Sequence, residues 1–529
     1  SGYPTLFNHL PEKLINVGTV SGIVTDEMKR KASDSYKWAR NRWRRQMGQW
    51  NIGFDEPLPE DELIPEPVSE LVAYENDLKI KPDIKLNLTK PNGLPINISS
   101  FEIGDPYLLF DFGTVRCGLI SFDIESMNGG TLDLAWDDRL TEDMSIEPCR
   151  STPNCDRVII YGGRIKWDGF FERGLRFLKI VFRQFNGNVT INNLSIKETL
   201  TAMPLEKTAK FECRDILLEN IWNAAFNTVR SYMNGCAAGD PVREKCHWFG
   251  DDSMAMRMAF YCFGDWKTWR RGLELTAQSQ NSNGSFPVVS PGHFEDTNMV
   301  TGSCGWVINV NDYYKHTGDT QFAKKMINHI DRHVNYELRF ADHSGLLYET
   351  PGRRFLSWAD GNERTPYKKG ETWTKKERKT WGDFFDPPTC GYNAIINIYW
   401  LWSLREASNL AYELNDFNIS ELYKKIFDTA FIRFNDLFFD NEQGLYRDNV
   451  VFNNEGEVNQ PTFCESTLFY LMKSKLIDQN KALSMYRIMM DEKFICCRAS
   501  GGLELSAVPV LLLAIVLIVL DAIKRKIKP

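Results

Sequence analysis

The densest group of side chains that could do chemistry lies in a short acidic and aromatic stretch. It reads Asp240-Pro241-Val242-Arg243-Glu244-Lys245-Cys246-His247-Trp248-Phe249-Gly250-Asp251-Asp252. Cleavage of a glycosidic bond usually takes two carboxyl groups, because one protonates the leaving oxygen and the other assists attack from the opposite face. Crowded carboxylates raise one another's pKa, and a neighbouring indole removes water, so one acid can stay protonated near neutral pH. The alternative is a surface loop with ordinary salt bridges.

Helices are expected to position this stretch. Apolar residues recur with helical spacing in residues 215–233, and the pattern returns at 307–314, 322–340, 394–414, 420–438 and 464–477. The acidic stretch directly follows the first of these helices and is punctuated by Pro241 and Gly250, which predicts a loop. Many amphipathic helices with Gly-containing connections favour an array or toroid of helical hairpins, in which the loops at one end share a cavity.

Strands are expected before the helices. Between about residues 71 and 200 the apolar period changes to two, which predicts strands at 108–113, 118–124, 131–136 and 178–182, with turns at 128–130 and 161–163. Closely spaced short strands of this kind predict a β-sandwich. Residues 1–70 combine a basic helical patch at 37–45 with a linker rich in Pro and acidic residues.

Composition restricts the partners. The net charge of −7 argues against nucleic acid, because phosphate binding needs a concentrated excess of Lys and Arg. The 15 Trp residues suit stacking on sugar rings, although large cores also use Trp. The 12 cysteines include no Cys-x-x-Cys pair, so no metal site is expected, and no cofactor is predicted.

The end of the sequence is strongly apolar. The run 505–520 is followed by Lys524-Arg525-Lys526, and it falls just short of the ~20 residues that span a bilayer. It is either a membrane anchor that leaves the basic end cytoplasmic, or a buried helix or a segment foreign to the fold. A secreted or surface-anchored location is favoured over a cytoplasmic one, and the oligomeric state is left open.

The acidic stretch resembles the signature of glycoside hydrolase family 78, the inverting α-L-rhamnosidases. In that family an Asp, a Pro, an Arg and a pair of acids lead into Trp-x-Gly-Asp; here the pattern is compressed, and the pair of acids appears as Glu244-Lys245. Other segments are similar to the family and follow its order over about residues 100–490: Asp111-Phe112-Gly113, Leu132-Asp133-Leu134-Ala135-Trp136, Arg173-Gly174-Leu175-Arg176-Phe177, residues 278–292, Trp358-Ala359-Asp360 and Asn393-Ala394.

The resemblance implies a multidomain β + α fold. A β-sandwich domain (71–204) is expected after the N-terminal helical and linker segment (1–70). An (α/α)6 six-hairpin toroid (205–495), incomplete at its C-terminal end, then carries the site, and an apolar tail with a basic end follows (496–529). The implied activity is hydrolysis of terminal α-L-rhamnosyl or related deoxy-sugar linkages with inversion, so a rhamnosylated glycoside or polysaccharide is the expected partner.

The resemblance also implies roles for individual residues. Glu244 becomes the general acid, while Asp240 and Asp251 bind sugar hydroxyls or tune Glu244; Asp240 stays a rival for the role of the acid. Substrate-binding candidates are Arg243, His247, Trp248, Trp306, Trp358 and Asp360. For the Trp residues packing in the core is the alternative, and His247 could equally be a structural histidine.

The general base is unknown. In the family it is a Glu in a Gly-x-Thr-Thr-x-Trp-Glu type segment, and no Trp-Glu follows Asp491 here. Glu504 lies near the expected position without the expected neighbours and is not assigned. Two alternatives to an active rhamnosidase therefore stay open: an inactive or carbohydrate-binding homologue that lacks the base, and another glycosidase or lyase on the same toroid.

Overall fold

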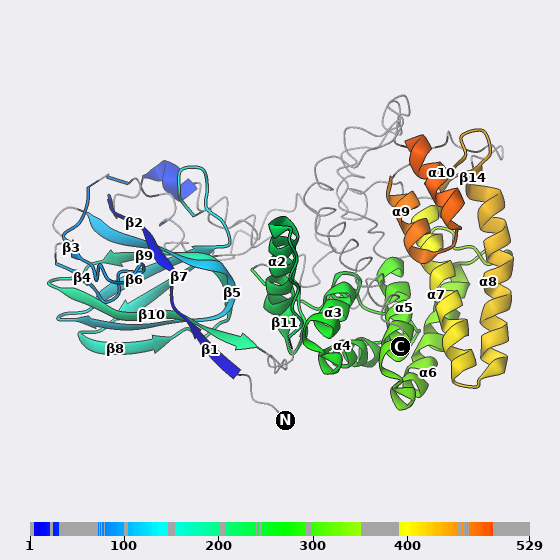
Figure 1. Cartoon of the computed structure of the whole chain (residues 1–529), viewed down its shortest axis with the longest axis horizontal. Helices are drawn as coiled ribbons and strands as arrows, with labels where there is room; N and C mark the ends of the chain where they lie inside the picture. The colour runs from blue at the N-terminus through cyan, green and yellow to red at the C-terminus, as the bar shows by residue number, and fades with distance from the viewer. Residues whose placement is uncertain are drawn as a thin grey trace, which may run out of the picture. The chain divides into compact units, whose positions relative to one another are not determined.

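The chain folds into two compact units. The computed structural model describes residues 5–21, 25–30, 72, 75, 77–78, 80–99, 104–146, 154–200, 208–239, 241–242, 246–290, 298–350, 391–452, 458, 461, 463 and 465–489. One unit comprises Ser1–Thr208 with Phe226–Cys246, and the other Ala209–Ala225 with His247–Pro529. The first carries strands β1 to β10 and the second carries helices α3 to α10 (Figure 1). The fold is thus of the multidomain β + α kind.

A single ten-stranded antiparallel sheet builds the first unit. Its strands follow the order β3-β4-β10-β5-β9-β6-β7, while β1 pairs with β10, and β2 and β8 pair with β5. The strands are β1 Thr5–His9, β2 Lys13–Val20, β3 Ile84–Lys85, β4 Ile96–Ile98, β5 Asp105–Ser126, β6 Gly130–Asp137, β7 Cys155–Ile160, β8 Gly163–Asp168, β9 Arg173–Arg183 and β10 Val189–Leu200.

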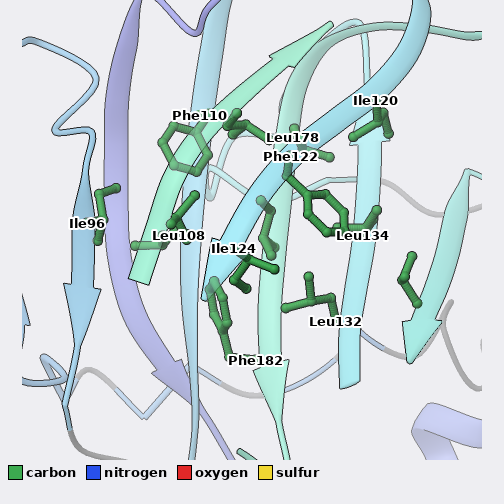
Figure 2. Packing of buried hydrophobic residues seen from close by; sticks show 14 of the residues in the cluster. Ile96, Leu108, Phe110, Ile120, Phe122, Ile124, Leu132, Leu134, Leu178 and Phe182 are labelled. Carbon is green, nitrogen blue, oxygen red and sulfur yellow. The ribbon is translucent and has the colours of Figure 1, made fainter. Parts of the chain in front are cut away.

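Alternate side chains of the sheet enter two different hydrophobic clusters. On β5, Leu108 and Phe110 join a large cluster, whereas Tyr107 and Leu109 join a smaller one. Strand side chains point to opposite faces with a period of two, so an apolar run buried on both faces supplies both clusters. Figure 2 shows the larger cluster, where side chains from β4, β5, β6 and β9 meet. Each fully buried Leu or Phe there contributes roughly 1.5–3 kcal/mol.

Strands expected at 131–136 and 178–182 are confirmed within β6 and β9. The two strands expected at 108–113 and 118–124 are instead one strand, β5, whose pairing with β9 shifts register between Asp111 and Arg116. Gly113 lies in this irregular part with a φ of 78°, and its amide donates to Asp111 Oδ1 over 2.8 Å. A glycine in the left-handed region interrupts the sequence pattern without ending the strand.

Helices of the second unit form consecutive hairpins. They are α2 Ile216–Tyr232, which runs from the second unit into the first, then α3 Phe249–Phe263, α4 Trp266–Gln278, α5 Val300–Thr317, α6 Thr320–Glu337, α7 Ala394–Glu413, α8 Phe417–Phe438, α9 Glu465–Ser474 and α10 Gln479–Met489. Neighbours in sequence pack as α3–α4, α5–α6, α7–α8 and α9–α10. In addition α3 contacts α5, α5 contacts α7, and α7 contacts α9.

Gly-Asp pairs make two of the hairpin turns. Gly264 and Gly318 end α3 and α5 in the left-handed conformation, with φ of 64° and 67°. The next residues, Asp265 and Asp319, cap α4 and α6 by accepting from the amides of Thr268 and Phe322, each over 3.0 Å. Glycine tolerates positive φ and aspartate satisfies a free amide at a helix start, so the chain reverses within two residues.

Several expectations from the sequence need correction or lie outside the described residues. Helices expected at 215–233, 307–314, 322–340, 394–414, 420–438 and 464–477 are confirmed in α2, α5, α6, α7, α8 and α9. Residues 1–70 were expected to be helical and linker, but β1 and β2 are sheet strands, because they pair with β10 and β5. The basic patch 37–45 and the tail 496–529 are not among the described residues. Within the described part, no helix is long and apolar enough to cross a bilayer.

Candidate active site

A backbone bridge brackets the six residues that include Asp240 and Glu244. Gly239 and Cys246 pair as an isolated antiparallel bridge, and the Cys246 amide donates to the Gly239 carbonyl over 2.9 Å. Of the residues between them, the structure describes only Pro241 and Val242, so the side chains of Asp240, Arg243 and Glu244 lie outside the described residues. The bridge fixes the separation of the two ends of this loop, which we call the acid loop (residues 240–245).

The segment before the acid loop is tied to the sheet. Arg230, in the last turn of α2, donates to Glu198 of β10 over 2.5 Å, and His9 of β1 lies 2.6 Å from the same carboxylate. Burial raises the pKa of Glu198, but the hydrogen bond from His9 and the positive charges of Arg230 and Arg116 lower it below its ordinary value. Glu198 is therefore an ionised buried anchor for the end of α2.

A short hairpin of two two-residue strands connects that anchor to the acid loop. Strands β11 (Met233–Asn234) and β12 (Cys236–Ala237) pair antiparallel around Gly235, whose φ is 77°. The Ala238 amide then donates to the carbonyl of Tyr232, the last residue of α2, over 2.8 Å. Residues 226–246 belong to the compact unit of the sheet, although the sequence alone assigned residues 205–495 to the helical toroid.

His247 is a buried residue at the end of the acidic stretch. Its Nδ1 lies 3.2 Å from Asp252 Oδ2, and the two side chains are 2% and 0% exposed. The ring also lies against Gly272 of α4: a Cβ added there would be 3.0 Å from His247 Cε1 and 2.4 Å from Met256 Sδ. This position favours the structural alternative for His247, because the ring is enclosed by Asp252 and α4.

Trp248 and the start of α3 depart from the expected loop. Phe249 begins the helix, so Gly250, Asp251 and Asp252 form its first turn instead of the end of a loop. Asp251 occupies a position at which the helix dipole favours a carboxylate, and its side chain lies outside the described residues. Trp248 is 9% exposed and pairs with Val289 through a backbone bridge. The first turn of α3 is thereby held against the 285–290 segment.

Trp306 is a core residue of α5. It is 2% exposed, its Nε1 donates to the Leu273 carbonyl over 3.1 Å, and its ring lies 4.8 Å from that of Phe286. With its single donor satisfied and its faces covered, packing is the role that this position favours. Trp358 and Asp360, the remaining candidates, lie outside the described residues.

Sequence reasoning missed a buried polar cluster between α5 and α6. Asn298 donates from Nδ2 to Glu337 Oε1 over 2.9 Å and accepts at Oδ1 from the Ser303 hydroxyl over 2.8 Å. His333 Nδ1 lies 3.9 Å from Glu337 Oε1, which is too long for a hydrogen bond. Burial raises the pKa of Glu337 to about 7 and lowers that of His333 to about 3.

A carboxylic acid that stays protonated up to near-neutral pH is chemically unusual. Glu337 is fully buried, and within the described part of the chain its Oε2 has no hydrogen-bond partner. The cluster joins the last turn of α6 to the residues that lead into α5. The sequence contained one signal for it, the i, i+4 spacing of His333 and Glu337 on the apolar face of an amphipathic helix. Among the described residues, no group of three or more His, Cys, Asp or Glu could hold a metal ion.

Several known proteins that are similar to this chain are rhamnosidases. A family described as the bacterial α-L-rhamnosidase six-hairpin glycosidase domain matches residues 206–458, a range that includes the acid loop, α3 and the polar cluster. A curated α-L-rhamnosidase from Formosa agariphila is 22% identical over 277 residues, which are 48% of this chain and 28% of that protein.

Two solved structures share the fold. The family 78 rhamnosidase of Bacillus sp. GL1 aligns with a TM-score of 0.67 at 21% identity, covering 82% of this chain and 42% of that one. A rhamnosidase from Klebsiella oxytoca, solved with rhamnose bound, aligns with a TM-score of 0.62 at 14% identity, covering 93% and 80%. The chain thus spans less than half of the Formosa and Bacillus proteins.

Proposed function

We propose that the chain is an α-L-rhamnosidase-like protein of glycoside hydrolase family 78 and that it hydrolyses terminal α-L-rhamnosyl, or related deoxy-sugar, linkages with inversion. The observation that carries the proposal is the acid loop: Asp240 and Glu244 fall within the matched glycosidase region, on a loop bracketed by the Gly239–Cys246 bridge. Terminal rhamnosyl groups of a glycoside or polysaccharide are the proposed substrate class.

The finer architecture belongs to the same proposal. The first unit is proposed to be a β-sandwich and the second part of an (α/α)6 toroid. Support comes from the packing order: four consecutive hairpins lie within the described residues, and α3, α5, α7 and α9 contact one another in sequence. In a toroid of helical hairpins every second helix belongs to the inner ring, which is the neighbour relation that these four helices have.

Glu244 is the proposed general acid. In an inverting mechanism a protonated carboxyl group gives its proton to the leaving glycosidic oxygen, while a base on the opposite face, about 6.5–9.5 Å away, activates water. Asp240 and Asp251 are proposed to bind sugar hydroxyls or to tune Glu244. Arg243 and Asp360 are proposed to bind the substrate.

Among the aromatic candidates, Trp358 is proposed to contact the sugar. Trp248, His247 and Trp306 are better suited to hold the site than to touch the sugar, because all three are buried. The general base stays unassigned, and Glu504 is not proposed for it.

A leaving-group series tests the role of Glu244. Glu244→Gln should lose at least about 100-fold in kcat on an alkyl α-L-rhamnoside, whose leaving oxygen needs a proton, and far less on a dinitrophenyl rhamnoside, whose leaving group needs none. The basic limb of its pH–rate profile should disappear as well. Asp240→Asn is the matched control, since a residue that only binds hydroxyls should slow both substrates alike. Parent-like cleavage of the alkyl substrate by Glu244→Gln would refute the assignment.

A second candidate function is carbohydrate binding without hydrolysis. It stays a candidate because no residue is assigned as the general base. Calorimetry with L-rhamnose, run beside a turnover assay, separates the two functions: heat of binding without product supports the binding protein, and product supports the hydrolase. Product from a different glycoside, with none from α-L-rhamnosides, would point to another glycosidase or lyase on this fold.

A further inference from the structure

The backbone of the sheet approaches the acid loop at Gly174. This residue is the second of β9, and an ideal Cβ built on it would lie 2.4 Å from the Pro241 carbonyl oxygen, 2.7 Å from the Pro241 carbonyl carbon and 3.0 Å from the Val242 nitrogen. Its φ is not in the left-handed region, so other residues could adopt the same backbone. Glycine is needed here for space alone.

The strand at this point is held from several sides. Gly174 pairs with Cys117 of β5. The neighbouring Arg173 donates to both oxygens of Asp156 of β7, over 2.9 and 3.2 Å, and its guanidinium lies 4.7 Å from the ring centre of Trp136 of β6. An added methyl group would therefore displace the loop and leave the strand in place.

The loop has little length in which to absorb a displacement. Pro241 directly follows Asp240 and precedes Glu244 by three residues, and the Gly239–Cys246 bridge closes the loop. A methyl group at residue 174 would force the Pro241 carbonyl back by at least about 0.6 Å to reach the 3.0 Å that real contacts respect. Misplacement of a catalytic group by ~1 Å can cost about 100-fold in rate.

We infer that Gly174 is a positioning residue for the acid loop: the sheet backbone at Gly174 is the surface against which the Pro241–Val242 peptide rests, and this peptide follows Asp240 directly and precedes Glu244 in the sequence. The inference rests on the proposed function of Glu244. Strand β9 would then affect the reaction indirectly, through one close backbone contact with the acid loop.

Gly174→Ala, compared with Gly169→Ala, tests the inference. Gly169 lies in the turn between β8 and β9, and a Cβ there would meet its nearest neighbours at an ordinary 3.4 Å, so the control adds the same methyl group without a clash. For Gly174→Ala, amide exchange at Cys246 should accelerate about tenfold or more. Its kcat on an aryl α-L-rhamnoside should fall roughly 10- to 100-fold, and the basic limb of the pH–rate profile should be displaced. Gly169→Ala should match the parent in every readout.

Amide exchange at Cys246 tests the inference about Gly174, whereas turnover of the rhamnoside tests the proposed function. A parent protein without turnover would count against the proposed function, while the exchange of Cys246 would still test the contact. If Gly174→Ala kept the exchange rate of the control, the inference would be overturned. If Gly174→Ala does not fold, Pro241→Gly tests the contact from the loop side, since it releases the fixed φ of residue 241 and leaves the sheet unaltered. Faster exchange at Cys246 supports the inference, and parent-like exchange overturns it.

Discussion

Burial keeps two titratable side chains of α6 uncharged near neutral pH. Glu337 and His333 are both fully buried, and neither gains enough from its neighbours to offset the loss of water around its charged form. Their shifts have opposite consequences for stability. Lowering the pH below 7 favours the folded state through Glu337, whereas lowering it below 6.5 disfavours that state through His333. Because the two effects oppose each other, the free energy of unfolding is expected to change little in mild acid through this pair.

Glu337→Gln isolates one of the two effects. The folded pKa of about 7 lies above the ordinary 4.5, so the stability that Glu337 contributes is complete below pH 4.5 and is lost as the pH rises to 7. The Gln side chain keeps an acceptor for Asn298 and cannot ionise. Unfolding free energies of parent and variant should therefore diverge by about 3 kcal/mol between pH 4.5 and pH 8, with the parent weaker at high pH. A difference that stays constant with pH would show that Glu337 does not titrate in this range.

At the scale of elements, the sequence predicted α6 and α8 but missed α3, α4 and α10. The amphipathic α6 and α8 were predicted, but α3 lacks a side-chain cap at Trp248 and buries residues around most of its surface, so no 3.6-residue period distinguishes it. The Gly264-Asp265 pair, in which a glycine ends one helix and an aspartate caps the next, could have predicted the start of α4. The positions of His247 and Trp306 could not be predicted, because Gly272, Leu273 and Phe286 enclose them from distant parts of the sequence.

Two helical glycines should respond to alanine with opposite signs. In α4, a Cβ on Gly272 would lie 2.4 Å from Met256 Sδ and 3.0 Å from His247 Cε1, so Gly272→Ala should destabilise the protein by about 1–3 kcal/mol through overpacking. In α5, a Cβ on Gly305 would meet only Tyr399 Cε1, at 3.9 Å, so Gly305→Ala should stabilise it by about 0.5–1 kcal/mol. Chemical denaturation of both variants gives the comparison; equal effects of the same sign would contradict these packing distances.

At the scale of the whole molecule, the chain passes between the two units more than once. It enters the helical unit at Ala209, returns to the sheet unit at Phe226 within α2, and leaves again after Cys246. The sequence predicted a single boundary near residue 204 because the apolar period changes there from two to 3.6. Which unit a helix end packs against depends on tertiary contacts such as Arg230–Glu198, and periodicity carries no information about these.

Glu198→Gln tests the anchor of the returning segment. The pKa of Glu198 is lowered in the folded state, so its contribution should be present above its ordinary value of 4.5 and lost as the pH falls through the lower folded value. At pH 7 the free energy of unfolding of the variant should be about 3 kcal/mol lower than that of the parent, because the partly buried Arg230 loses its ionic partner. The gap should close in strong acid. Asp428→Asn, which removes an exposed ion pair with Lys424, should leave the unfolding curve unchanged.

The return of the chain to the sheet unit also limits how such a protein can be recombined. A chimera that joined a foreign sheet unit at residue 205 would cut the chain where sequence comparison alone places the boundary. It would retain Glu244 in its sequence, yet the strand beneath the Pro241–Val242 peptide would come from another parent. A donor with any residue larger than glycine at the position of Gly174 would then be incompatible with this acid loop, however well its own sheet folds.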